Sequence, residues 1–174
     1  VLASSFQSAG QRCSALRVLY VQEDIADGVI EMIRGGFAAL TVGDPADLST
    51  DVGPVIDAEA RGALEAHIAD CAAKGWPVTR LPLPEGAERG CFVAPTIIEV
   101  PSIRALQDEN FGPVLHVARF SAGELPKVVA DINATGSTGD AWQRPAGDQE
   151  DIDRVDRRLA GLPHAVSIGI ATIE

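Results

Sequence analysis

Two apolar segments decide the fold: ALRVLYVQ at residues 15–22 and PVLHVARF at residues 113–120. Each has the length and the Val- and Leu-rich composition that are typical of a β-strand. Two further segments continue this pattern: CFVAPTIIEV at residues 91–100, with Pro95 at an edge or a bulge, and a shorter stretch at residues 77–83. The sequence therefore predicts four strands within its first 120 residues.

Helical patterns lie between and after these strands. Apolar residues recur three and four positions apart over residues 25–40, behind Asp24, and a second helix follows Asp57 and ends near Gly75. Asp24 and Asp57 are of the type that caps a helix N-terminus. A third helix is expected at residues 124–134. The order of the elements predicts an α/β fold, an open sheet flanked by helices.

Composition limits the partners of the chain. Its 174 residues contain 14 Lys and Arg against 25 Asp and Glu, a formal net charge of −11, so nucleic acid and anionic membranes would repel it. The hydrophobic content of 46 % is typical of a globular protein, and no apolar run approaches the roughly 18 residues of a membrane helix. Three cysteines and the lack of a Lys- or Arg-led signal peptide favour a reducing, cytoplasmic setting.

The two ends of the chain differ from its middle. Val1 is not Met and lies in a helical pattern, so we expect the chain to be part of a longer protein. From residue 137 the sequence turns polar and weakly patterned, with a charged helix expected at residues 148–159 and a strand at residues 165–173. We therefore expect a domain at residues 1–136 and an atypical tail at residues 137–174, which is either flexible or divergent.

Cys13 lies in a segment that suits nucleophilic chemistry. It follows Gly10, Gln11 and Arg12, where the backbone can turn sharply, and the small residue Ser14 comes next. A thiol attacks as the thiolate, which a nearby cation or exposed backbone N–H groups favour. Such N–H groups can also hold an oxyanion. On spacing alone this signal is weak, and a buried, structural cysteine is the more common case.

A second segment, ENFGPV at residues 109–114, combines a carboxylate, an aromatic ring and a turn. Glu109 can accept paired hydrogen bonds from a ribose diol, and Phe111 can pack on the sugar or on a nicotinamide ring. Gly112 and Pro113 favour the turn that presents these side chains. Taken alone, a Glu before an apolar strand is also typical of a solvated surface.

Together, the two segments resemble the aldehyde dehydrogenase family. SAGQRCSALRVLYVQ at residues 8–22 resembles its nucleophile segment and ENFGPVLHV at residues 109–117 its cofactor-ribose motif, with GDP, DVGPVI and GCFVAPTIIEV between them in the family's order. GQRCSALR, with INATG at residues 132–136, resembles the glutamate-semialdehyde (1-pyrroline-5-carboxylate) dehydrogenase module of bifunctional proline utilization flavoproteins. The resemblance covers residues 4–136 and implies an incomplete catalytic domain of this family.

This resemblance implies a reaction and a role for several residues. On this resemblance, Cys13 would attack L-glutamate γ-semialdehyde, hydride would pass to NAD, and water would cleave the resulting thioester to glutamate, a step of proline catabolism. Ser14 helps to bind the substrate carboxylate, and the Cys13 N–H supplies half of an oxyanion hole. Glu109 binds the nicotinamide ribose, with Phe111 packed beside it. A structural or electrostatic role is implied for Arg12.

The chain also departs from the family's pattern. The family's dinucleotide-binding half precedes the nucleophile and is not in this chain, and STGDAWQRPAG stands at residues 137–147 where the family continues differently. Half a cofactor site positions a nicotinamide poorly. We therefore keep an alternative: the chain is an inactive remnant that acts as a structural or interaction module, associating with the missing N-terminal half or with copies of itself. A cysteine hydrolase would need a His base near Cys13, and no motif supplies one.

The other cysteines and histidines are assigned to the core. Cys71 lies on a helix stripe and Cys91 begins an apolar segment, so we expect both to be structural. His67 lies near the same stripe and His116 within a strand, without Cys or carboxylate partners at metal-binding spacing. We predict no metal site.

Overall fold

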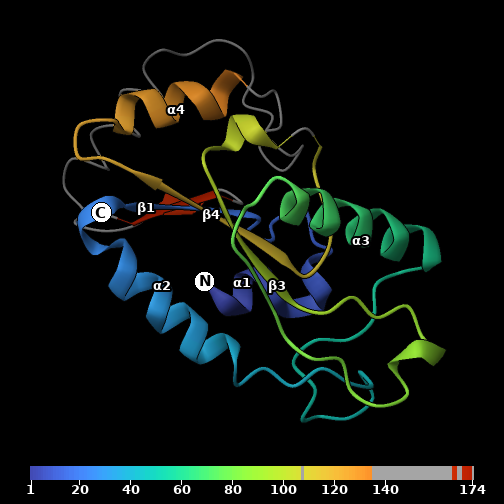
Figure 1. Cartoon of the computed structure of the whole chain (residues 1–174). Coiled ribbons are helices and arrows are strands. Elements are labelled where there is room, and N and C mark those ends of the chain that lie inside the picture. The colour runs from blue at the N-terminus through green and yellow to red at the C-terminus, as the bar shows by residue number, and fades with distance from the viewer. Residues whose placement is uncertain (107, 135–165, 168–169, 174) are drawn as a thin grey trace.

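The computed structural model describes residues 1–106, 108–134, 166–167 and 170–173, which form a six-stranded sheet with helices on both faces (Figure 1). The strands are β1 (Val18–Gln22), β2 (Val78–Arg80), β3 (Thr96–Val100), β4 (Val114–Phe120), β5 (Val166–Ser167) and β6 (Ile170–Ile173). The α-helices are α1 (Leu2–Phe6), α2 (Glu23–Phe37), α3 (Ala58–Ala73) and α4 (Leu125–Ala134). Three short 3-10 helices are η1 (Gln7–Gly10), η2 (Ala87–Arg89) and η3 (Ile103–Ala105).

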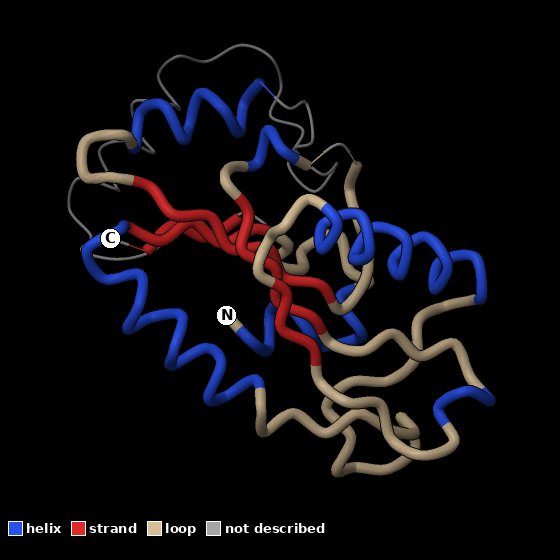
Figure 2. The backbone as a smooth tube through the Cα atoms, viewed as in Figure 1, coloured by secondary structure: helices blue, strands red, loops and turns tan. Residues whose placement is uncertain are grey.

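The strand order is β2-β3-β4-β1-β6-β5. Figure 2 shows the strands in the middle of the molecule, with helices and loops around them. The four central strands run parallel, and the two edge strands, β2 and β5, pair antiparallel with their neighbours. The predicted open sheet flanked by helices is therefore confirmed, with each of the four strands expected in the first 120 residues present.

The central strands are covered on both faces. The first four residues of β1 are all buried, as expected for a parallel strand with apolar cover on each side. Figure 1 shows α1 and α2 below the sheet and α3 and α4 above it. Side chains that point to opposite faces of β4 therefore meet different helices. His116 contacts His67 of α3, whereas Arg119 pairs with Asp27 of α2 at 2.8 Å.

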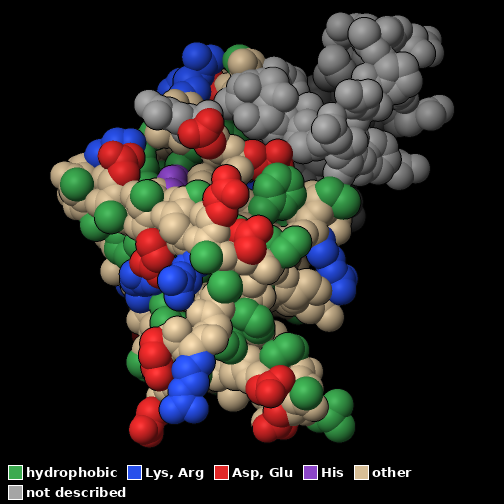
Figure 3. All heavy atoms as spheres, turned by 90° about the vertical axis from the view of Figure 1, so that its right-hand side faces the viewer, with side chains coloured by type: hydrophobic (Ala, Val, Ile, Leu, Met, Phe, Trp, Pro, Cys, Tyr) green, Lys and Arg blue, Asp and Glu red, His purple; other side chains and the backbone are tan. Residues whose placement is uncertain are grey.

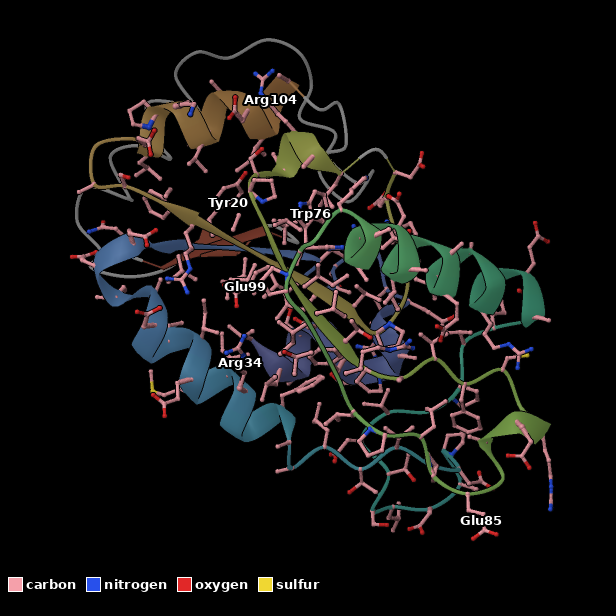
Figure 4. The ribbon with its side chains drawn as sticks, in the orientation of Figure 1. Tyr20, Arg34, Trp76, Glu85, Glu99 and Arg104 are labelled. Atoms are coloured by element: carbon pink, nitrogen blue, oxygen red, sulfur yellow. The ribbon has the colours of Figure 1, made fainter. Side chains whose placement is uncertain are left out.

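Helix α2 packs an apolar stripe on the sheet. Its buried residues, which recur three or four positions apart, are Ala26, Ile30, Ile33 and Phe37. The ring of Phe37 lies 5.3 Å from that of Phe6 in α1, between centroids. On the same side of the sheet, Arg34 of α2 and Glu99 of β3 point toward one another (Figure 4), and the Arg34 Nη2 donates to the Glu99 Oε1 at 2.8 Å.

The two predicted helix caps differ in outcome. Asp57 caps α3, because its Oδ1 accepts a hydrogen bond from the Ala60 N–H at 2.8 Å. The prediction that Asp24 caps α2 is wrong: α2 begins at Glu23 with Gln22 as its N-cap. Strand β1 runs into α2 without a linking residue, so Asp24 falls in the first turn, where it accepts from the Gln22 side chain at 2.7 Å.

The end of the chain contributes to the sheet. The prediction of a single strand at residues 165–173 is wrong: β5 and β6 are separate strands that pair antiparallel with each other. β6 pairs in parallel with β1, with Val18 opposite Ile170. The charged helix expected at residues 148–159 lies outside the described residues. The division of the chain after residue 136 stays a prediction.

One face of the molecule carries side chains of both charges (Figure 3). Figure 3, which views the molecule from the side of α3, shows acidic and basic side chains mixed among apolar ones. None of the helices in the described part of the chain is both long enough and apolar enough to span a membrane.

The cap of α3 offers a test of the fold. We expect Asp57→Ala to lower the free energy of unfolding by about 1 kcal/mol, because the Ala60 N–H loses its acceptor. Asp24→Ala is the matched control, since Asp24 caps no backbone group, and should cost less. Urea unfolding of the full chain measures both; equal losses would contradict the assigned caps.

Candidate functional site

The segments predicted to carry the nucleophile and the ribose-binding carboxylate meet at one end of the sheet. Residues 10–17, here named the Cys13 loop, lead into β1, and residues 108–113, the Glu109 loop, lead into β4. β1 and β4 are adjacent and parallel, with Val18 opposite His116. Because adjacent parallel strands begin at the same edge of a sheet, the two loops lie side by side.

The Cys13 loop is entered through a left-handed turn. Ser8, Ala9 and Gly10 have φ angles of 55°, 53° and 65°. This conformation costs an L-residue such as Ser8 or Ala9 about 1–2 kcal/mol. It is held by burial of Ala9, which is 1 % exposed, and by a hydrogen bond from the Gln11 N–H to the Ser8 carbonyl at 3.2 Å. The cost is thus offset by packing at the base of the loop.

A close backbone contact joins the two loops. A Cβ atom on Gly10 would lie 2.0 Å from the carbonyl oxygen of Gly112 and 2.9 Å from that of Ser5. A Cβ atom on Gly112 would lie 2.4 Å from a methyl group of Leu64 on α3. Gly10 therefore needs glycine, because a Cβ there would meet backbone atoms, whereas a Cβ on Gly112 would require the Leu64 side chain to move. The Cys13 loop packs directly on the backbone of the Glu109 loop.

Cys13 and Ser14 are exposed beyond this contact. The Ala15 N–H donates to the Arg12 carbonyl at 3.0 Å and closes a turn around them. The other cysteines differ as predicted: Cys71 is buried, which raises the pKa of its thiol, and Cys91 is half-buried against the core. Of the three thiols, that of Cys13 is therefore the accessible one.

Arg17, at the end of the Cys13 loop, contacts both loops. Its Nη1 donates to the Arg12 carbonyl at 3.1 Å and its Nη2 to the Cys13 carbonyl at 3.3 Å. The same Nη2 forms an ion pair with Oε1 of Glu109. The Arg17 guanidinium carbon also lies 4.6 Å from the centroid of the Phe111 ring, a cation–π contact. One side chain therefore connects three of the predicted site residues: Cys13, Glu109 and Phe111.

A pair of histidines lies beneath this site. The carbonyl of Arg17 faces the His116 N–H at 2.9 Å and the His116 Nδ1 at 3.0 Å, so it can accept from both. The His116 Nε2 lies 2.8 Å from the His67 Nε2, and the Cys71 Sγ lies 3.6 Å from that His67 atom. Burial is the main reason that the pKa of His116 falls to about 4, and burial also lowers the pKa of His67. Both rings are therefore neutral at pH 7.

Sequence reasoning missed Arg17 and the histidine pair. Arg17 is one of 14 basic residues, and only its place directly before a strand distinguishes it. His67 and Cys71 are four residues apart on one helix, which signals a shared face, but the approach of His116 from β4 comes only with the fold. Within the described ranges, no three His, Cys, Asp or Glu side chains are grouped so that they could hold a metal ion.

Known proteins are similar to this chain in sequence and in fold. Residues 1–148 match the family described as "Aldehyde dehydrogenase family". The bifunctional protein PutA of Escherichia coli K12 is 50 % identical over 170 residues, which cover 94 % of this chain and 12 % of that protein. A crystal structure of a Bradyrhizobium japonicum proline utilization A (PutA) mutant has a TM-score of 0.72 at 49 % identity, covering 78 % of this chain and 14 % of that one.

A Mycobacterium tuberculosis aldehyde dehydrogenase complexed with NAD⁺ has a TM-score of 0.67 at 27 % identity, covering 74 % of this chain and 27 % of that one. The chain thus spans about an eighth of the length of the PutA relatives that it matches.

The glycine contact makes the first prediction of this site. Gly10→Ala should lower the free energy of unfolding by about 3 kcal/mol, because the added Cβ meets backbone atoms and the φ angle is left-handed. Gly28→Ala, on α2 where a Cβ meets no atom within 4 Å, is the control and should be neutral or stabilising. Denaturant unfolding of the full chain compares them; a Gly10→Ala loss no larger than that of Gly28→Ala would refute the contact.

The buried His116 makes a second prediction, for acid stability. The unfolded chain takes up a proton at this residue near pH 6.5 and the folded chain only near pH 4, so the neutral ring contributes stability that is present above pH 6.5 and lost as the pH falls toward 4. Over this window the loss is about 3 kcal/mol for this residue. His116→Asn, which cannot titrate, should show a shallower decline in urea midpoint. Parallel declines in the two proteins would contradict the burial of a neutral ring.

Proposed function

The chain belongs to the aldehyde dehydrogenase family, and we propose that it carries the nucleophile and the nicotinamide-ribose contacts of an NAD-dependent dehydrogenase. The proposed reaction is oxidation of L-glutamate γ-semialdehyde (1-pyrroline-5-carboxylate) to glutamate in proline catabolism. The observation that carries this proposal is the meeting of the exposed Cys13 with Glu109 and Phe111 across two adjacent strands. Similarity to proline utilization A proteins supports the choice of pathway.

The residues present fit the nicotinamide-ribose end of NAD. Arg17 holds Glu109 through Oε1, while Oε2 makes no hydrogen bond within the described part of the chain and is left to accept from ribose hydroxyls. The ring of Phe111 is 42 % exposed and so offers a flat apolar surface beside this carboxylate. The NAD⁺ complex of a structural relative supports NAD as the cofactor.

In the proposed mechanism, Cys13 forms and later releases the covalent intermediate. Its thiolate attacks the aldehyde carbon, the C=O π electrons move to the oxygen, and the oxyanion of the resulting tetrahedral thiohemiacetal accepts a hydrogen bond from the Cys13 N–H. NAD, when bound, supplies the acceptor for the hydride that leaves this carbon. Cys13 then holds the acyl group as a thioester, which water cleaves to the carboxylate and the free thiol. Ser14, exposed beside Cys13, is proposed to bind the substrate carboxylate.

We also propose that the chain works in association with further parts of such a dehydrogenase or with other copies of itself. The short share of the PutA relatives that it spans, 12 % for the protein of Escherichia coli, supports this. The excess of acidic residues and the three free cysteines support a cytoplasmic location without nucleic-acid partners.

Turnover by the chain tests the proposed function. We expect NADH to form when glutamate semialdehyde and NAD are added to the full chain, and Cys13→Ala to abolish it, because no other accessible thiol lies at the site. Cys91→Ala, a half-buried cysteine outside the two loops, is the matched control and should retain activity. Absorbance of NADH at its nicotinamide band is the readout.

Two outcomes would count against the proposal. Activity that survives Cys13→Ala would remove Cys13 from the reaction. No NADH formation together with no measurable NAD binding by calorimetry would favour the alternative, an inactive structural or interaction module of the same family.

A further inference from the structure

We propose that Arg17 is a positioning residue, which holds the Cys13 loop and the Glu109 carboxylate in one fixed arrangement. The proposal rests on the functions proposed for Cys13 and Glu109. It adds a residue that touches neither the aldehyde nor the reacting atoms and that acts through these two.

The contacts of Arg17 with the Cys13 loop act on the backbone. Nη1 and Nη2 donate to the carbonyls of Arg12 and Cys13 at 3.1 and 3.3 Å. The Arg12 carbonyl belongs to the same peptide group as the Cys13 N–H, the proposed oxyanion donor, and the Cys13 carbonyl belongs to the next peptide group. Because both are tied to one planar guanidinium, the orientation of the peptide that precedes Cys13 is set by Arg17.

The contacts with the Glu109 loop act on side chains. Oε1 of Glu109 is held by the Arg17 Nη2, and the Phe111 ring lies against the guanidinium with 4.6 Å between the centroid and the guanidinium carbon. The Arg17 side chain is only 12 % exposed, so solvent screens these interactions less than on an open surface. A ribose would therefore meet a carboxylate that is already oriented, which reduces the entropy lost on binding.

Arg17 is itself anchored to the core. Its carbonyl faces the backbone N–H and the Nδ1 of His116, at 2.9 and 3.0 Å, on the neighbouring strand. The guanidinium thus bridges the loops from a fixed base at the start of β1. Lysine could not replace it, because one ammonium cannot reach two carbonyls and a carboxylate and also stack on a ring.

Hydrogen–deuterium exchange of the full chain, followed by mass spectrometry, tests this role without needing NAD to bind. In Arg17→Met we expect exchange to rise about tenfold in both loops, residues 10–16 and 108–113, because each loses charge-assisted hydrogen bonds or an ion pair. Exchange in β1 and β4 should stay unchanged, which separates loop release from loss of the fold. Arg34→Met, which breaks an ion pair on α2 away from both loops, is the matched control.

Two further variants separate positioning from general support. Arg17→Lys keeps the positive charge opposite Glu109. Hydrogen exchange in residues 108–113 should therefore stay near the wild-type level, whereas exchange in residues 10–16 should be raised as in Arg17→Met. Glu109→Gln should loosen residues 108–113, and Arg17→Met added to it should raise exchange there by less than in the wild-type background, because the two changes remove one shared contact.

The proposal is overturned if Arg17→Met raises hydrogen exchange in residues 10–16 but not in residues 108–113, or if it raises exchange nowhere. It is likewise overturned if exchange in β1 and β4 rises as much as exchange in the two loops. It is also overturned if Arg34→Met gives the same pattern, or if the Met and Gln changes are additive in residues 108–113. Absence of NADH formation by the wild-type chain would speak against the proposed function. The exchange experiment does not depend on NADH formation, so it would still test whether Arg17 holds the two loops.

Discussion

The backbone of Gly10 lies against the backbone of Gly112, and the arrangement of the whole site depends on this contact. The two residues are far apart in the sequence and are brought together because β1 and β4 are parallel neighbours whose preceding loops share one edge of the sheet. Leu64 of α3 packs on the other side of Gly112, so the position of the Glu109 loop is also tied to a helix. A side chain at position 10 would meet the Gly112 backbone and one at position 112 would meet Leu64, so each would disturb the packing that holds the loops in place. Backbone packing comes first here, and the polar contacts are built on it.

Which groups of the site carry a charge depends on how deeply each group is buried. Arg17 is largely buried and is balanced by Glu109, while the ring of Phe111 faces its guanidinium. Beneath it, His116 is almost fully buried, and a second positive charge there would lack both water and an anionic partner. The neutral His116–His67 pair supplies donors and acceptors without adding charge. The polar groups beneath the site thus form neutral hydrogen bonds. The ion pair between Arg17 and Glu109 lies nearer to solvent than His116 does.

The sequence predicted most of the local structure and much less of the long-range contacts. Strand and helix periodicity located the central strands and α2, and the Asp57 cap was recognised because such a cap involves residues three positions apart. Asp24 was wrongly predicted to be the N-cap of α2. β1 leads into α2 without a linking residue, and the residue types in this segment do not show where the strand ends. The candidate residues Cys13, Glu109 and Phe111 came from a family resemblance, whereas Arg17 acts through partners 92 and 94 positions away that only the fold brings near.

The place of β6 in the sheet has a consequence for the order of folding. β1 lies between β4 and β6, so one of its edges is paired by the final residues that the structure describes. During synthesis from the N-terminus, the hydrogen-bonding groups of that edge stay open until residues 170–173 have left the ribosome. Such non-local pairing is slow, and an apolar strand with an open edge is prone to pair with other chains. The strand that follows the proposed nucleophile is therefore open to pairing with other chains until β6 has formed, and this is the interval in which a chaperone would protect it.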